Sequence, residues 1–233
     1  MDPGVLVTRD LLLTGYDAKR CARRIHNEWD PSVEQVTWAV PPEVQMRFDA
    51  GNQFEETVFT DLSTELGPSR CVDLSVVRGK AQSIAETLAA MEDGVAVILG
   101  GWLPDDAAGG RSGKPDVLLK VAPGRYVPGD VKAHKMISRR AKGVLTYSTF
   151  AAPADQLHAD GLAAATTARF DDYLQLAHYW RMLQAIDRAP VGASLGVIIG
   201  RDDVPDLVPN GRVLTWLVLD APLCETYSRT QGK

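Results

Sequence analysis

The sequence predicts an α/β fold in which helices flank a mixed central β-sheet. Three observations support it: the chain has 233 residues, 45% of them are hydrophobic, and strand-like segments alternate with helix-like segments. A chain of this length and composition can bury a good core as one domain. We therefore predict a single domain over residues 1–233, with a mainly helical part at 1–68 and an α/β core at 69–233.

The first quarter of the chain is predicted to be helical. A basic helix is expected at Asp17–His26, after a hydrophobic segment. A long helix covers EVQMRFDAGNQFEETVFTDLSTEL, with two prolines in its first turn and Gly-Pro just past its end. Glu55 shares a face of this helix with Val58 and Leu62, so it is expected to point inward. Gly51, one turn earlier, is expected to leave room for another backbone.

The rest of the chain alternates strands and helices. Strands are predicted at 71–77, 95–102, 115–121, 125–133, 194–199 and 212–219, and helices at 80–91 and 170–186. Residues 157–169 are rich in alanine and threonine, and we expect them to form a mobile loop.

Composition argues against several classes of protein. No apolar run approaches the length of a membrane span and no signal peptide opens the chain, so we expect a cytoplasmic protein without a membrane partner. The three cysteines do not have the spacing of a disulfide framework. The net charge of −5 is compatible with a nucleic-acid ligand, because affinity depends on the local field more than on total charge.

Two aspartates and a lysine carry the main functional signal. Asp116 opens one predicted strand, and Asp130 and Lys132 lie near the end of the next. The turn at 122–124 makes the two strands a hairpin, so the aspartates can approach each other. Asp130 and Lys132 are two residues apart and therefore face the same side of their strand.

These side chains suit the hydrolysis of a phosphodiester. Two carboxylates, together with phosphate oxygens and water, form a sufficient site for Mg²⁺ or Mn²⁺. A bound cation lowers the pKa of a water molecule, and Lys132 could orient that water or stabilise charge on the phosphorus. An alternative is a Pro-Asp turn followed by a strand with solvated charges.

The pattern Pro115-Asp116 followed by Asp130-x-Lys132 resembles the PD-(D/E)xK nuclease superfamily. A Gln-x-x-x-Tyr pair in the predicted helix 170–186 is similar to that of the RecB-like branch, which includes CRISPR spacer-acquisition nucleases and the C-terminal nuclease of RecB. The resemblance implies a restriction-endonuclease-like core with an N-terminal helical segment. The site residues that it implies are Asp116, Asp130, Lys132, Glu55, Gln175 and Tyr179.

In this resemblance Asp116, Asp130 and Glu55 would bind the metal, and Gln175 with Tyr179 would brace the site. The segment GNQFEETV resembles the first nuclease motif. Many RecB-like members have a histidine ligand in this region, where this chain has glutamine and phenylalanine.

The same resemblance raises the question of an iron–sulfur cluster. Cys21 matches the cysteine ligand that RecB-like families carry near the N-terminus, but Cys71 and Cys224 do not belong to a CxxC pair. Because a cubane cluster is usually held by four thiolates, we do not expect a cluster from this chain alone. Three reduced cysteines in or near the core are the alternative.

Two basic clusters are candidates for contact with DNA phosphates. The candidate residues are Lys135, Arg139, Arg140 and Lys142 after the predicted active-site strand, and Arg23 and Arg24 in the first helix. Solvated surface is the alternative for both clusters. His134 could touch DNA or be a satisfied histidine at the edge of the sheet.

The sequence thus predicts a Mg²⁺- or Mn²⁺-dependent deoxyribonuclease, exonuclease-like on DNA ends or single strands, in repair, recombination or defence. A helicase or another repair or defence protein could deliver the DNA. Two alternatives stay open. One is a non-catalytic nucleic-acid-binding or complex-building module, and the other is a structure-specific or restriction endonuclease.

Overall fold

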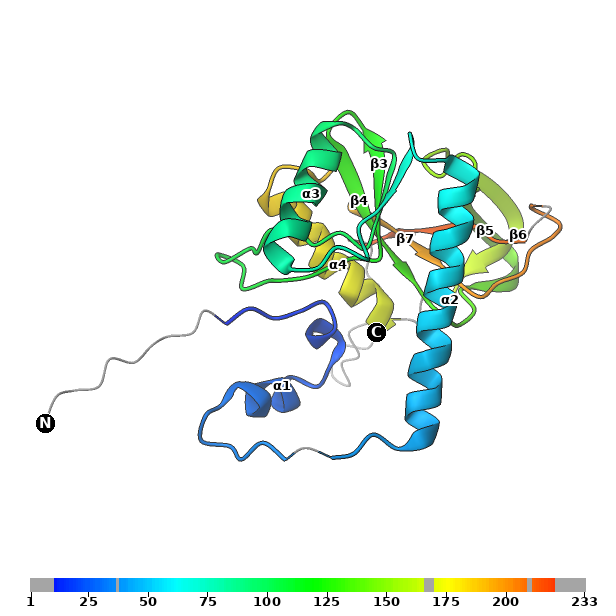
Figure 1. Cartoon of the computed structure of the whole chain (residues 1–233). Helices are drawn as coiled ribbons and strands as arrows, with labels where there is room; N and C mark the ends of the chain where they lie inside the picture. The colour runs from blue at the N-terminus through cyan, green and yellow to red at the C-terminus, as the bar shows by residue number, and fades with distance from the viewer. Residues whose placement is uncertain (1–10, 37, 166–169, 209–210, 221–233) are drawn as a thin grey trace, which may run out of the picture.

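The structure of the protein is a computed structural model that describes residues 11–36, 38–165, 170–208 and 211–220. Within these ranges, eight strands form one sheet in the order β1-β2-β3-β4-β7-β8-β5-β6. Helices cover both faces of the sheet (Figure 1). The predicted α/β architecture with a mixed, helix-flanked sheet is thereby confirmed.

Most predicted elements are present with shifted ends. The strands are β1 (Cys71–Asp73), β2 (Val97–Leu99), β3 (Val117–Ala122), β4 (Arg125–Val131), β5 (Ile137–Ser148), β6 (Leu157–Ala164), β7 (Leu195–Ile199) and β8 (Leu214–Val218). The helices are η1 (Asp17–Lys19), α1 (Ala22–Trp29), α2 (Pro42–Leu66), α3 (Lys80–Glu92) and α4 (Phe170–Ala185). β1 and β2 are shorter than predicted because they pair with each other over only three residues.

Alternation along the strands divides the core between the two faces of the sheet. Val97 and Leu99 pack in a cluster with the buried side chains of α2, whereas Ile98 between them packs in a cluster with α3 and α4. Successive strand residues point to opposite faces, so a three-residue strand can serve both layers. The result is a sandwich with α2 on one face and α3 and α4 on the other (Figure 1).

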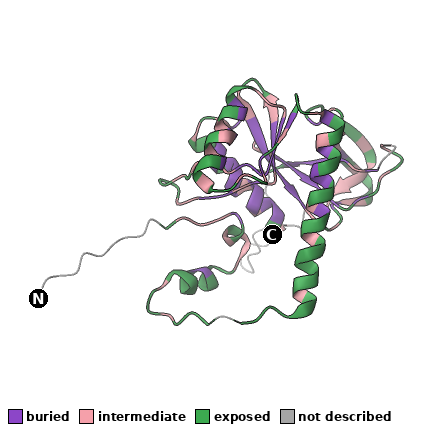
Figure 2. Cartoon of the chain, in the orientation of Figure 1, coloured by how far each residue is buried: buried purple, intermediate pink, exposed green. Residues whose placement is uncertain are grey.

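Only the second half of α2 is packed. Its buried residues begin at Phe54 and continue to Leu66, while Met46 and Phe48 in the first half are 70% and 50% exposed. Figure 2 shows the same division along the helix. The expectation that another backbone approaches Gly51 is wrong, because a Cβ atom at this position would meet nothing within 4 Å.

Two predictions of local structure are wrong. Residues 157–164 form strand β6 instead of a loop, paired with β5 in a hairpin that ends the sheet; residues 166–169 lie outside the described ranges. The hairpin is held by backbone hydrogen bonds and small side chains, so it lacks the apolar alternation that identifies strands. The predicted helix at Asp17–His26 is divided into η1 and α1, because Cys21 has a ψ of 123°, outside the helical region.

The topology gathers several strand ends at one edge of the sheet. β4 and β7 are parallel and end side by side, with Val131 opposite Ile199. β3 is antiparallel to β4, with Val117 opposite Gly129, so β3 begins at the same edge. Among the described residues, no helix is long and apolar enough to cross a membrane.

Candidate active site

The β3–β4 hairpin brings the two predicted aspartates together. Asp116 directly precedes β3 and Asp130 is the penultimate residue of β4, so the antiparallel register places them opposite each other. The Oδ2 atom of Asp116 accepts a hydrogen bond of 2.8 Å from the backbone N–H of Val131. The turn between the strands therefore fixes the separation of the carboxylates, as the sequence predicted.

Lys132 lies one residue past the end of β4 and points at the same carboxylate pair. Its ammonium forms an ion pair with Oδ2 of Asp130. Asp130 is only 1% exposed, so its buried charge requires a compensating partner, and Lys132 supplies it in the described part of the chain.

The electrostatics of the three groups are coupled. Burial raises the pKa of Asp116 well above its usual range, and the neighbouring carboxylate of Asp130 raises it further. Burial opposes the charge of Lys132, but the carboxylates of Asp130 and Asp116 outweigh this effect and raise the pKa of the lysine. Two neighbouring carboxylates repel each other unless a proton or a cation is shared between them.

Glu55 faces the site from α2 without completing it. The residue is half-buried, and its pKa is raised first by burial and then by the charge of Asp130, against the opposing charge of Lys114. Within the described ranges, no three His, Cys, Asp or Glu side chains are arranged to hold a metal ion. Glu55 is therefore not brought into one ligand group with Asp116 and Asp130.

The two aspartates fit a hard divalent cation that takes only some of its ligands from the protein. Mg²⁺ usually binds through one or two carboxylates and keeps several waters or phosphate oxygens. Asp116 and Asp130 would supply such a pair, and a bound cation would take the place at Oδ2 of Asp130 that the ammonium of Lys132 holds in this structure. Glu55 could act through an intervening water.

The predicted Gln–Tyr pair on α4 lies beside these groups. Gln175 donates a hydrogen bond of 3.3 Å from Nε2 to the hydroxyl of Tyr179, one helical turn away. Its Oε1 atom accepts a hydrogen bond of 3.1 Å from Nζ of Lys132. Both α4 residues are buried, and burial raises the pKa of Tyr179. The glutamine therefore restrains the ammonium group of Lys132.

A second lysine reaches the site from the N-terminal segment. Nζ of Lys19 donates a hydrogen bond of 2.8 Å to the same Oε1 atom of Gln175 that accepts from Lys132. Burial lowers the pKa of Lys19, and the neighbouring charge of Lys132 lowers it further. Lys19 was not predicted, because it lies 156 residues from Gln175 and its short segment carries no periodic signal.

His134 is engaged by the protein itself. Its Nε2 atom lies 2.9 Å from Oδ2 of the buried Asp172 on α4. Burial works against ionisation of Asp172, but the hydrogen bond with His134 and the charge of Lys132 outweigh it and lower the pKa of the carboxyl. Of the two interpretations of this histidine, the geometry supports a satisfied residue at the edge of the sheet.

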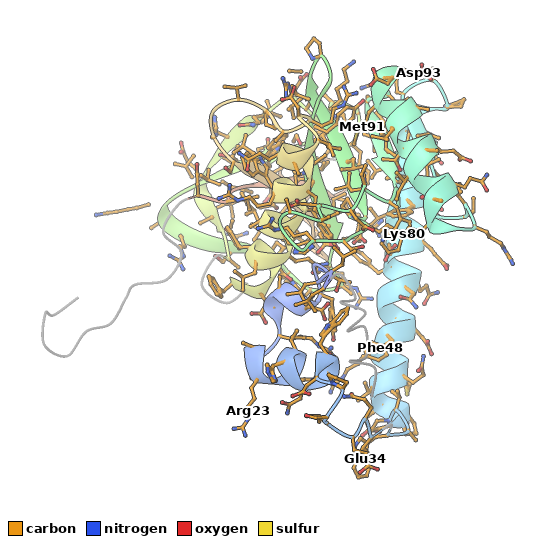
Figure 3. All side chains as sticks on the ribbon, turned by 90° about the vertical axis from the view of Figure 1, so that its left-hand side faces the viewer. Arg23, Glu34, Phe48, Lys80, Met91 and Asp93 are labelled. Atoms are coloured by element: carbon orange, nitrogen blue, oxygen red, sulfur yellow. The ribbon has the colours of Figure 1, made fainter. Side chains whose placement is uncertain are left out.

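The predicted basic clusters lie outside the group formed around Asp130. Lys135 is exposed after β4, and Arg139, Arg140 and Lys142 are exposed on β5. Arg23 extends from α1 away from the sheet (Figure 3).

Arg24 forms an ion pair of 2.9 Å with Glu28 on the same helix. Of the cysteines, Cys21 is exposed and Cys71 is buried with its sulfur 3.8 Å from the hydroxyl of Ser63, and Cys224 lies outside the described residues.

The group around Asp130 can attract a cation and an anion at once. The carboxylates of Asp116 and Asp130 lie beside the ammonium groups of Lys132 and Lys19, and Lys132 is ion-paired with Asp130. Comparison of the sequence with protein-family models and with curated proteins, and of the structure with solved structures, finds no match.

Proposed function

We propose that this chain is a Mg²⁺- or Mn²⁺-dependent deoxyribonuclease with a restriction-endonuclease-like core, of the RecB-like branch of the PD-(D/E)xK superfamily. One observation carries the proposal: Asp116, Asp130 and Lys132 meet at a single edge of the sheet, on the hairpin where the motif expects them. The Gln175–Tyr179 pair beside them supports the RecB-like assignment.

A cation held by Asp116 and Asp130 would supply an activated water and neutralise phosphate charge. The remaining roles belong to the chain itself. Lys132 positions the water or stabilises negative charge on the phosphate oxygens, and Gln175 restrains its ammonium through the 3.1 Å hydrogen bond. Lys19 adds a second positive charge next to that of Lys132, since both ammonium groups donate to the same oxygen of Gln175. Tyr179 holds the amide of Gln175 in the orientation that presents Oε1 to both lysines.

The substrate that we propose is DNA, taken at an end or as a single strand, in repair, recombination or defence inside the cell. A helicase or another protein of such a pathway could supply it. A structure-specific or restriction endonuclease is the alternative on the same site. Closed circular DNA separates the two, because an exonuclease requires an end.

A non-catalytic nucleic-acid-binding module is the second candidate. It is favoured by the ion pair between Lys132 and Asp130, which occupies the carboxylate in this structure, and by the separation of Glu55 from the aspartates. Such a module would bind DNA and release no product with any metal.

A cleavage assay tests the proposal. Purified protein is incubated with Mg²⁺, Mn²⁺ or EDTA and with linear or closed circular, single- or double-stranded DNA. Asp116→Asn and Lys132→Met are each expected to lower the metal-dependent rate by about 10² or more, the scale of electrostatic catalysis. Asp93→Asn is the matched control, since Asp93 caps the end of α3 next to Gly94, whose carbonyl accepts from Lys120 near the far end of β3 from Asp116.

Cleavage at the normal rate by folded Asp116→Asn protein would remove the aspartate pair from the mechanism. Absence of cleavage by the unchanged protein with every metal and substrate would favour the binding module.

A further inference from the structure

A polar cavity of about 440 Å³ opens beside the catalytic edge of the sheet, on the face covered by α2. Two arginines from the strand ends and one aromatic side chain from α2 form its centre: Arg201, Arg212 and Phe54. None of them belongs to the group described around Asp130. A cavity of this size is within the range that takes a small-molecule ligand.

The backbone joins this cavity to the candidate active site. The N–H of Lys132 donates to the carbonyl of Ile199 at 3.0 Å, and the N–H of Arg201 donates to the carbonyl of His134 at 2.8 Å. Arg201 therefore follows β7 directly alongside the residues that follow β4. On α2, Phe54 immediately precedes Glu55. A strand of substrate that leaves the aspartate pair along this edge would reach the cavity next.

The two guanidinium groups are held on an aromatic ring. The central carbons of Arg201 and Arg212 lie 5.4 Å and 5.5 Å from the ring centre of Phe54. Arg212 also forms an ion pair with Asp61. Arg201 is exposed, and no carboxylate of the described residues pairs with it. Its positive charge is therefore available to a ligand.

The carboxylates that line the cavity differ in how far they offset this charge. Asp202 is buried, and its two oxygens accept backbone hydrogen bonds of 2.6 Å from Met136 and 3.0 Å from Ile137. Its negative charge is therefore directed into the backbone. Asp203 is exposed and solvated. Arg201 and Asp203 are the exposed lining charges that have no ion-pair partner among the described residues, and Arg201 is the one that can attract an anion.

We propose that this cavity binds one nucleotide of a single-stranded DNA next to the cleavage position, with Arg201 as its principal contact. Guanidinium groups donate paired hydrogen bonds to phosphate and stack on planar rings. Proteins that bind single strands combine such positive charge with flat stacking surfaces. Inside a duplex both faces of each base are covered by neighbouring pairs, so we take the base that stacks here to be an unpaired one. The inference rests on the proposed nuclease function and narrows its substrate to single strands.

The test measures binding without cleavage. Fluorescence anisotropy with a labelled oligo-dT strand, and with the same length of duplex, is recorded in EDTA on protein carrying Asp116→Asn. Adding Arg201→Gln is expected to weaken binding of the single strand about tenfold, within the range for loss of one stacked base. Binding of the duplex is expected to change less than about twofold. Arg181→Gln is the matched control, because Arg181 is an exposed arginine on α4, across the sheet from the cavity.

Two further variants keep the test independent of one substitution. Phe54→Leu keeps an apolar side chain under the arginines and removes the ring that orients them, so it is expected to weaken single-strand binding about threefold or more. Arg212→Gln is expected to act less than Arg201→Gln, since Asp61 already shares the charge of Arg212.

The proposal is overturned if Arg201→Gln binds the single strand as tightly as Arg181→Gln does, if it weakens single strand and duplex equally, or if the starting protein binds no single strand. Cleavage by the unchanged protein is recorded separately. If the unchanged protein cleaves DNA and Arg201→Gln binds the single strand normally, the nucleotide site is wrong and the nuclease proposal stands. If Arg201→Gln selectively loses single-strand binding but the unchanged protein cleaves nothing, the nuclease proposal is wrong and the nucleotide site stands.

Discussion

At the scale of single residues, Asp116 shows how a proposed metal ligand can work against stability. Its carboxyl is partly desolvated and faces Asp130, so its pKa in the folded protein is raised. A group with a raised folded pKa stabilises the fold fully below its unfolded pKa, about 3.9 for aspartate, and loses that contribution as pH rises through the folded pKa. Without metal, the raised pKa of Asp116 therefore lowers stability at neutral pH.

The first prediction follows from the direction of this pKa shift. Asp116→Asn keeps an oxygen that can accept the N–H of Val131 and stays neutral at every pH. In EDTA at pH 8 the variant is expected to be more stable than the unchanged protein by about 1 kcal/mol, and the difference should vanish toward pH 4. Urea unfolding at both pH values measures it, with Asp93→Asn as control. A variant that is less stable at pH 8 would contradict the assigned desolvation.

Lys19 gives the second prediction. Gln175 accepts hydrogen bonds from Lys19 and Lys132 on one oxygen, so the two ammonium groups are held close together beside Asp130. Lys19→Met removes one positive charge near the phosphate and is expected to lower the single-turnover rate about tenfold while the fold is retained.

Lys120→Met is the matched control for this variant. Lys120 is also half-buried and donates one hydrogen bond, to the carbonyl of Gly94, but it lies near the opposite end of β3 from Asp116. Equal rates for the two variants would assign Lys19 a structural role only.

The sequence predicts which residues of the candidate site lie together where local geometry fixes their positions. The turn after β3 sets the register that joins Asp116 to Asp130, and the helical period sets Gln175 one turn from Tyr179. Lys19 escapes such reasoning because its place depends on how a distant segment packs. Arg201 escapes it for the same reason, since only the parallel pairing of β4 with β7 brings it beside Lys132.

At the scale of secondary-structure elements, α2 combines a packed half with an unpacked half. Leu62 is completely buried against the sheet, whereas Met46 is 70% exposed. Leu62→Ala is expected to lower the free energy of unfolding by about 3 kcal/mol, because it removes apolar contacts and leaves a cavity. Met46→Ala is expected to change it by less than about 0.5 kcal/mol. Denaturant unfolding of both variants checks whether only the second half of α2 is packed. Similar losses of unfolding free energy in the two variants would contradict it.

The β5–β6 hairpin is the element that the sequence least reveals. β5 pairs with β8 through only two residue pairs, and its pairing with β6 is interrupted by a register shift between Arg139 and Val144. Charged, exposed side chains at an edge lack the alternation that identifies a buried strand. The basic residues predicted to follow the active-site strand therefore lie on a strand of their own.

The fourth prediction concerns this basic surface. Changing Arg139, Arg140 and Lys142 to glutamine is expected to weaken DNA binding for all sequences and to reduce the slope of log affinity against log salt by up to about 2 for single strands. The single-turnover rate at saturating DNA should change little, since none of the three contacts the aspartate pair. An unchanged slope would place the DNA path elsewhere, and the pair Arg23 and Arg24 would be tested next.

At the scale of the whole molecule, the site is assembled from segments far apart in the sequence. The N-terminal segment is attached to the core by two backbone hydrogen bonds of 2.9 Å, from Leu13 to Gly110 and from Ser112 to Leu13. Beyond these bonds, Gly15 lies against the ring of Tyr179 and Lys19 reaches Gln175. Docking of this segment therefore decides whether the second lysine is present at the site.

The last prediction tests that docking directly. A Cβ atom at Gly15 would lie 2.7 Å from a ring carbon of Tyr179, which is too close, and the buried tyrosine is held by Gln175. Gly15→Ala should therefore displace the segment and lower the cleavage rate about as far as Lys19→Met does, roughly tenfold.

The matched control is Gly51→Ala, where the new methyl group meets nothing within 4 Å. Gly51 lies inside α2, so alanine should add up to about 1 kcal/mol of stability through helix propensity and leave the rate unchanged. Thermal unfolding and single-turnover cleavage are measured on both variants. The buried core lies between the helices and the sheet, so displacing the N-terminal segment should leave most of it intact. Gly15→Ala is therefore expected to lower the cleavage rate with little change in Tm. If Gly15→Ala cleaves at the normal rate, the N-terminal segment contributes nothing to catalysis, and the hydrogen bond between Lys19 and Gln175 is dispensable.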